Sequence, residues 1–362
     1  MGAIVDKNFT STIPFEWSGG LPIINVKIAG KTYKFLFDTA APTTIPSALA
    51  KELQLKTVGK GRKLDRSLYK LPLLKVGDIG FKDYVVFVDD FKSKFPISCL
   101  GFDGIFGYNT MKDMKIKVDY QNQKITFSDK EIPHIEYIPV DIKFNYRYGP
   151  LVRLDFPFGN ADFQIDTGKN ANIQLGNPSV IPMMQKQGFS FREIRGIASS
   201  SIGGNNNHTQ REYLAKDFSL DSKIKIKSFP IEVDNSGAFL IGNGFLKHFD
   251  LIIDFPAQKV YFKAIKQGVI DEGFNDTFGL TPFWDKNKGL FVSAITDKTP
   301  AKEANLKIGQ KIISFNGKET SAMSQDDFCK LLLKYSNINK QKMLDISVKS
   351  NNGESKKIIL KK

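Results

Sequence analysis

Two short stretches of this 362-residue chain end in an aspartate followed by a threonine. FLFDTAAPTT (35–44) contains Asp38 and FQIDTGKNAN (163–172) contains Asp166, an offset of 128 positions. One such pair after an apolar strand is most simply a strand that ends in a turn. Two at equivalent places instead indicate a shared site, where carboxylates held close together cannot both ionise readily.

A pair of carboxyl groups that shares one proton can hydrolyse an amide. The ionised member takes a proton from water while the protonated member donates to the carbonyl oxygen under attack. We expect Thr39 and Thr167 to bond the backbone of the opposing loop and hold this geometry. Small residues at Ala40 and Gly168 would let the two loops pack closely.

The elements around the pair are repeated along the chain. IFGYNTMKDMKIKVDYQNQKITF (105–127) aligns without a gap with LIGNGFLKHFDLIIDFPAQKVYF (240–262), and Gly107 meets Gly242. Each copy begins with an alternating hairpin and ends with a short helical turn and a final hairpin. We therefore expect two barrel-like sheet units of about 130 residues each.

The pattern changes after the second copy. A strand, GLFVSAIT, is followed by an amphipathic helix, SQDDFCKLLLKYS, with Ser324 as its start signal, and by two final strands. The predicted fold is mainly β, with two duplicated β-barrel lobes and a small α+β domain. The expected boundaries are 1–132, 133–266 and 267–362.

Composition narrows the function classes. The net charge of +14 raises a nucleic-acid alternative, which predicts affinity that falls steeply with salt. The lysines, however, are spread singly along the chain, as on solvated strand faces, so we expect no nucleic-acid partner. No stretch approaches the roughly 20 apolar residues of a membrane span. The first residues lack a signal peptide's pattern, although a trimmed chain would look the same.

Cysteine and histidine are rare. Cys99 and Cys329 fall in segments assigned to different domains, so we expect two buried, inert thiols and no disulfide. His134, His208 and His248 have no metal-site spacing, and we expect no metal or cofactor.

The motifs resemble those of retropepsin-like and pepsin-like aspartic proteases in their single-chain, two-lobed form, over residues 12–265. The signature Asp-Thr-Gly-x is matched at 38–41 and 166–169, and the landmark of two apolar residues and a glycine at 105–107 and 240–242. The resemblance implies an aspartic endopeptidase with a polypeptide substrate, working as a monomer. Its catalytic residues would be Asp38 and Asp166, supported by Thr39, Thr167, Ala40 and Gly168.

Two residues depart from the family pattern. Ala40 replaces the usual glycine, which is tolerable at negative φ and costs about 1 kcal/mol or more at positive φ. Lys169 stands where the family has a small or hydroxyl residue. Its ammonium would oppose proton sharing if it lies near the pair, and does nothing if it points outward. These departures motivate an alternative, a catalytically inactive peptide-binding or scaffolding protein that keeps the protease fold.

The family covers its cleft with a hairpin flap. In the second copy the Gly-, Ser- and Asn-rich stretch 196–209 is the candidate, with Ile202, Gly203 and Gly204 at its tip. In the first copy the candidate is Tyr69. Plain surface loops explain both stretches equally well.

The C-terminal segment resembles a PDZ domain of the kind attached to bacterial proteases. It keeps the family's Thr299-Pro300-Ala301, Gly309 and Asn316-Gly317. Phe278, Gly279, Leu280 and Thr281 then form the candidate loop for a peptide's C-terminal carboxylate, with a plain hairpin start as an equal alternative. Such proteases are usually exported, which implies a periplasmic or cell-surface location.

Overall fold

The first lobe is a closed β-barrel. The computed structural model describes residues 2–61, 66–145, 149–197, 199–201, 204–206, 210–349 and 353–362. β5 lies between β4 and the parallel strand β10, and the pairing of β8 with β9 closes the ring. The barrel strands are β4 (Leu21–Ile28), β5 (Lys31–Asp38), β6 (Thr44–Pro46), β8 (Ser67–Val76), β9 (Ile79–Asp89) and β10 (Gly104–Gly107). Around them lie β1 (Ala3–Ile4), β3 (Glu16–Ser18), β7 (Thr57–Lys60), α1 (Ser47–Glu52), η1 (Phe91–Ser93), η2 (Ile97–Leu100) and α2 (Tyr108–Met111).

The second lobe repeats this arrangement. β16 pairs in parallel with β23, as β5 does with β10, and the pairing of β15 with β21 closes the barrel. The barrel strands are β15 (Gly149–Phe156), β16 (Gly159–Ile165), β17 (Ile173–Leu175), β21 (Gln210–Leu220), β22 (Ile224–Val233) and β23 (Phe239–Ile241). Around them lie β14 (Lys143–Asn145), η3 (Pro178–Val180), α3 (Ile181–Lys186), β18 (Phe191–Gly196), β19 (Ser199–Ser201), β20 (Gly204–Asn206), α4 (Asn243–Leu246) and β26 (Ile270–Asp271).

The closing hairpins of the two copies form a sheet of their own, which the sequence did not predict. Its six strands run in the order β13-β25-β24-β11-β12-β2, with β11 of the first copy antiparallel to β24 of the second. These strands are β2 (Thr10–Pro14), β11 (Lys115–Asp119), β12 (Lys124–Ser128), β13 (Ile138–Asp141), β24 (Phe249–Asp254) and β25 (Lys259–Ala264). A single hydrophobic core passes through both lobes and this sheet, so the lobes are joined by packing as well as by the chain.

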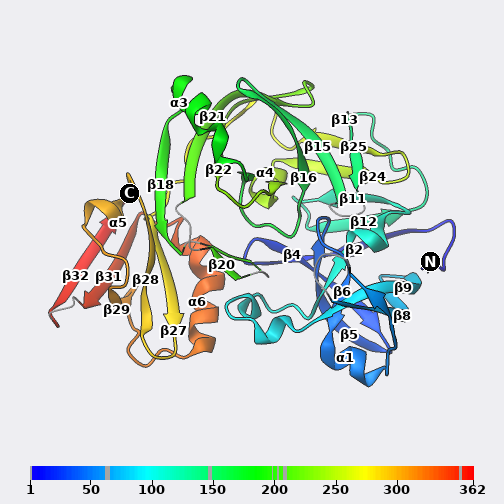
Figure 1. Ribbon diagram of the computed structural model, residues 1–362, viewed down its shortest axis with the longest axis horizontal. Helices are drawn as coiled ribbons and strands as arrows, with labels where there is room; N and C mark the ends of the chain where they lie inside the picture. Colours follow the sequence, from blue (N-terminus) through cyan, green and yellow to red (C-terminus); the bar gives the residue numbers. More distant parts are fainter. Residues whose placement is uncertain are drawn as a thin grey trace.

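The third domain is a small α+β unit with its own core, at the left of Figure 1. Helix α6 begins at a capping box in which Ser324 and Asp327 satisfy each other's backbone N–H groups. The elements are β27 (Leu280–Asp285), β28 (Gly289–Thr296), α5 (Pro300–Glu303), β29 (Lys311–Phe315), β30 (Lys318–Glu319), α6 (Gln325–Ile338), β31 (Met343–Lys349) and β32 (Ser355–Lys361). No helix among the described residues is long and apolar enough to cross a membrane.

The expectation of two unpaired thiols is wrong. Cys99, in η2 of the first lobe, forms a disulfide with Cys329, in α6 of the third domain. The two Cα atoms are 4.7 Å apart because η2 packs against α6, well within disulfide range. The cysteines are 230 residues apart in sequence, and nothing local to either one indicated that contact.

Candidate active site

The two Asp-Thr loops are locked together by their threonines. The Thr39 hydroxyl donates to the carbonyl of Ile165 (2.6 Å), and the Thr167 hydroxyl donates to that of Phe37 (2.8 Å). Each hydroxyl also accepts the other threonine's backbone N–H, at 3.0 and 3.2 Å. Both side chains are fully buried, so these four bonds are shielded from water. The bonds to the opposing loop expected from the sequence are present.

A glycine lies directly behind each loop. A Cβ on Gly107 would lie 2.2 Å from the carbonyl oxygen of Ala41, and one on Gly242 would lie 2.3 Å from that of Ala171. Strand pairing brings the first contact about, since Gly107 is opposite Asp38 in the parallel ladder of β10 and β5. No larger residue fits at either glycine without moving a candidate catalytic loop.

Asp38 is buried at the end of β5, with 6% of its surface exposed. Its Oδ1 accepts the backbone N–H groups of Ala40 (2.7 Å) and Ala41 (2.9 Å). Burial raises the pKa of Asp38 to about 6, and these two N–H groups oppose the rise.

Asp166 follows β16 and is 9% exposed. Its Oδ1 accepts the N–H of Gly168 at 2.9 Å. Burial, followed by the charge of Asp38, raises the pKa of Asp166 well above its usual range. The Lys169 ammonium and the N–H groups of Gly168 and Lys169 oppose this rise. Two buried carboxyls that repel one another can hold one proton between them.

The carboxyl of Asp38 lies against the backbone of the opposite loop. A Cβ on Gly168 would lie 2.2 Å from Asp38 Oδ2 and 2.4 Å from its Cγ. A side chain at 168 would therefore displace the Asp38 carboxyl. Among the described residues, those with positive φ include neither Ala40 nor Gly168. The backbone strain considered for Ala40 is consequently absent.

Lys169 does not point freely outward. Its Nζ lies 3.4 Å from Oε2 of Glu232 on β22, and both side chains are mostly buried. Glu232 in turn faces Glu212 across the β21–β22 ladder, and Glu212 is paired with the buried Arg192 of β18. The Lys169 ammonium thus acts on Asp166 while it is held by a carboxylate of its own lobe.

Two buried polar residues at the site were not predicted from the sequence. Gln164 donates through Nε2 to the carbonyl of Ala40 (3.0 Å), from the second lobe to the first. Asn243 donates through Nδ2 to the carbonyl of Thr167 (2.7 Å). The sequence does contain one indication of a role for Gln164: it is a polar residue within the apolar run FQID, at the position where the first copy has Leu36.

The candidate flap residues are only partly described. Tyr69 lies in β8 and packs against the main core. Ile202 and Gly203 lie outside the described residues, whereas Gly204 begins the short strand β20, which pairs with β19. The stem of this second-lobe segment is the pair β18 and β21.

The candidate carboxylate loop surrounds the start of β27. Phe278 is fully buried beneath the Lys362 ammonium, 4.6 Å from its ring centroid. Gly279 has φ +74°, and a Cβ there would lie 1.9 Å from the Thr299 hydroxyl oxygen. The carbonyl of Leu280 accepts the Tyr335 hydroxyl of α6.

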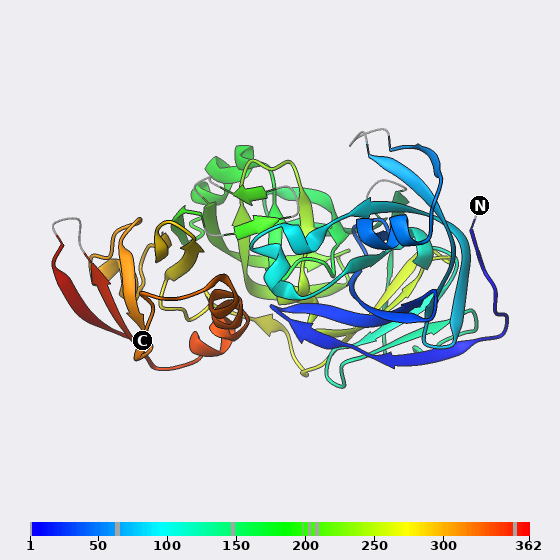
Figure 2. The same cartoon turned by 90° about the horizontal axis from the view of Figure 1, so that it is seen from below.

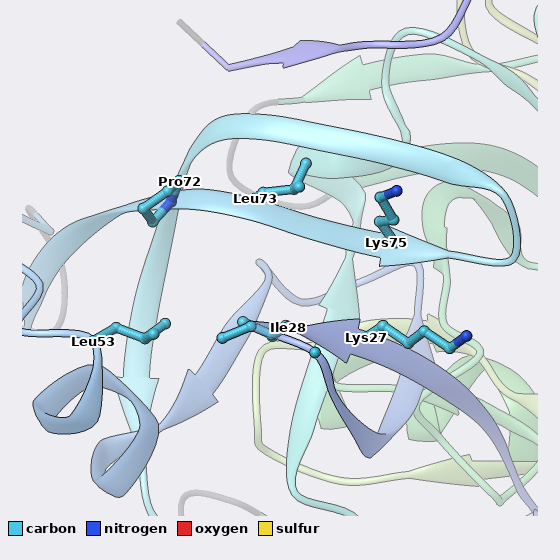
Figure 3. A pocket seen from close by; sticks show the side chains of 8 residues that line it. Lys27, Ile28, Leu53, Pro72, Leu73 and Lys75 are labelled. Carbon is cyan, nitrogen blue, oxygen red and sulfur yellow. The ribbon is translucent and has the colours of Figure 1, made fainter.

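The hollows elsewhere on the lobes do not involve these residues. Figure 3 shows one of about 390 Å³ on the outside of the first barrel, between β4 and β8, with Lys27 and Lys75 at its edge. Another, of about 400 Å³, lies beside Trp17 and His248.

In the part of the chain that the structure describes, no group of three or more His, Cys, Asp or Glu side chains could hold a metal ion.

Two family models match parts of this chain. Residues 24–110 match the family model described as aspartyl protease, and residues 268–349 match that of the PDZ domain. One similar solved structure is the aspartic proteinase from Irpex lacteus, at 12% identity and a TM-score of 0.46, covering 71% of this chain and 97% of that one. A search of the curated proteins finds no significant match.

The first lobe is thus of the aspartyl protease type and the C-terminal domain is a PDZ domain. The chain as a whole has two barrel-like lobes with paired Asp-Thr loops, followed by this PDZ domain.

Proposed function

We propose that this protein is an aspartic endopeptidase that hydrolyses peptide bonds with Asp38 and Asp166 and an activated water. The observation that carries the proposal is the pair of buried carboxyls on loops joined by the reciprocal bonds of Thr39 and Thr167. One carboxylate takes the proton of water and the other carboxyl donates to the substrate carbonyl. Both loops belong to one chain, so the site needs no second copy, and we propose a monomer as the active form.

Cleavage of a mixed peptide library between about pH 3 and 8 tests the proposal. Asp38→Asn and Asp166→Asn each remove an acid-base group, and each is expected to lower the cleavage rate by about 10²- to 10⁴-fold. Asp78→Asn changes an exposed carboxylate of the same lobe and is the matched control. Cleavage at an unchanged rate in both active-site variants would contradict the enzyme proposal.

The alternative function is a non-catalytic peptide-binding protein. The Lys169 ammonium favours it, because it stabilises the ionised form of Asp166 and so opposes proton sharing. This alternative predicts library peptides that bind without turnover at every pH. If the protein only binds peptides, the Lys169→Met variant should show no cleavage either. If it is an enzyme, the variant should still cleave peptides, with a changed pH dependence of the rate.

We also propose an extracytoplasmic location. The disulfide between Cys99 and Cys329 supports it, because such bonds form and persist in oxidising compartments. Fractionation of the native cells, with non-reducing electrophoresis of the intact chain, tests this.

A further inference from the structure

A backbone acceptor on the peptide-binding strand of the PDZ domain, β27, is already hydrogen-bonded to a side chain of the same domain. Thr296 N–H donates to the carbonyl of Gly279, so the next residue, Leu280, turns its carbonyl away from β28 towards the free edge of β27. That carbonyl accepts the Tyr335 hydroxyl. An incoming peptide strand would have to compete for this acceptor.

A first-lobe segment covers the groove between β27 and α6. Phe95 contacts the rings of Phe283 and Trp284 of β27 and of Phe328 of α6, with centroids 5.4–5.9 Å apart. Since Phe95 belongs to the loop between η1 and η2, the first lobe supplies an apolar side chain to a groove of the third domain. In Figure 2 this cyan segment lies directly beside α6.

The space left beside Phe95 is a largely apolar cavity of about 370 Å³. Its walls include Phe283 of β27 and Leu332 of α6, and Pro96 and Leu100 of the first-lobe segment line another side of it. This volume suits one apolar side chain or a few, so its natural occupant is the end of a peptide lying along β27. The segment 91–101 restricts access to it.

The disulfide fixes this cover. Cys99 lies in the covering segment and Cys329 follows Phe328 on the groove helix, so the bond joins the two walls of the cavity. The chain contains no other cysteine. Reduction by a dithiol would transfer two electrons and two protons to this bond, giving two thiols here and a cyclic disulfide in the reductant.

The groove is also linked to the second-lobe stem. The Ser293 hydroxyl of β28 lies 2.8 Å from the carbonyl of Ile197 and 3.1 Å from that of Thr281. β18 extends the PDZ sheet by pairing with β28, as Figure 1 shows. Ile197 and Thr281 both line the cavity. One side chain therefore contacts the stem and the candidate carboxylate loop.

We propose that access of peptides to the groove between β27 and α6 is redox-controlled, because the chain's own segment 91–101 obstructs the groove in the oxidised protein. Once the Cys99–Cys329 bond is reduced, the site takes a peptide with an apolar C-terminal residue and a free carboxylate. The segment acts as a tethered competitor. This inference rests on the PDZ groove and not on the hydrolytic function proposed above.

Fluorescence anisotropy with the full-length protein tests it. The probe is a fluorescein-labelled decapeptide ending in valine with a free carboxylate, and the same peptide amidated is the control. Protein reduced with dithiothreitol is expected to bind the probe at least about tenfold more tightly than oxidised protein, because a tethered segment competes at roughly millimolar effective concentration. Cys329→Ser and Cys99→Ser should each reproduce the reduced state without reductant.

Phe95→Ala supplies a second route that leaves the disulfide in place. It should also tighten binding in the oxidised protein, whereas Lys92→Ala, which removes an exposed side chain of the same segment outside the contacts with β27 and α6, should not. Equal affinity of oxidised and reduced protein, or no binding of the free-carboxylate peptide by either, would overturn the proposal. If the cysteine variants fail to fold, the dithiothreitol comparison on the wild type decides alone.

Discussion

Ala40 and Gly168 occupy equivalent places in the two loops, yet the structure treats them differently. The Asp38 carboxyl lies where a Cβ of residue 168 would be, 2.2 Å from Oδ2, and it is held there by two backbone N–H groups. Ala40 carries a Cβ in a backbone conformation with no positive φ. The departure from the family pattern at Ala40 is therefore compatible with an intact pair of loops, and only at residue 168 would an added Cβ displace a candidate catalytic carboxyl.

We expect Gly168→Ala to be far more damaging than Ala40→Gly. The new methyl group at 168 must displace Asp38 from its N–H donors, at a cost of about 1–3 kcal/mol. Ala40→Gly adds only backbone freedom, which costs about 1 kcal/mol or less. Thermal unfolding of the two variants measures the difference. Equal losses of stability would show that residue 168 does not contact Asp38 as described.

The buried carboxyls should also make stability depend on pH. The pKa of Asp38 is about 6 in the folded protein, above its usual value near 4 when unfolded. Folding is therefore favoured while the carboxyl is protonated, and this contribution is lost as pH rises from about 4 through 6. Residue 38 cannot titrate in the Asp38→Asn variant. The unfolding temperature of this variant minus that of the wild type should therefore increase between pH 4 and 8. Asp78→Asn, at an exposed site, should follow the wild type throughout; a constant Asp38→Asn difference would contradict the argument.

At the scale of elements, the repeat in the sequence was sufficient to predict the two lobes. Alternating apolar residues fix strands such as β4 and β5, and the duplicated Asp-Thr and glycine motifs fix which strand ends meet. The hydroxyl groups of Thr39 and Thr167 bond the opposing loop for the same reason, since a duplicated loop needs a duplicated partner. The pairing of the two closing hairpins with each other could not be predicted, because periodicity specifies which face of a strand is buried and not which strand lies beside it.

Side chains that act across elements were equally hard to predict. Gln164 reads in sequence as a polar interruption of β16, and only the folded chain shows its amide bonded to the opposite loop. The joining of β18 to β28 is another such case, because an exposed strand edge accepts any compatible strand. Through this pairing the second lobe and the PDZ domain share a sheet.

At the scale of the whole molecule, the PDZ domain is attached to both barrel lobes. β28 continues the sheet of the second lobe through β18, and the disulfide and Phe95 hold it to the first lobe. A domain that follows the two barrel lobes in sequence therefore contacts each of them. The PDZ domain thus bridges the two lobes.

Loss of the disulfide should therefore loosen this assembly without unfolding the lobes. A bond that closes a loop spanning 230 residues typically stabilises a fold by about 2–4 kcal/mol, in part by restricting the unfolded chain. In the double variant Cys99→Ser/Cys329→Ser we expect faster amide hydrogen exchange in α6 and β27, whose contacts with the first lobe depend on the bond. Exchange in β5 and β16, which are held by the main core, should stay unchanged. Uniformly faster exchange over the whole chain would instead mean that the disulfide supports the two barrel lobes themselves.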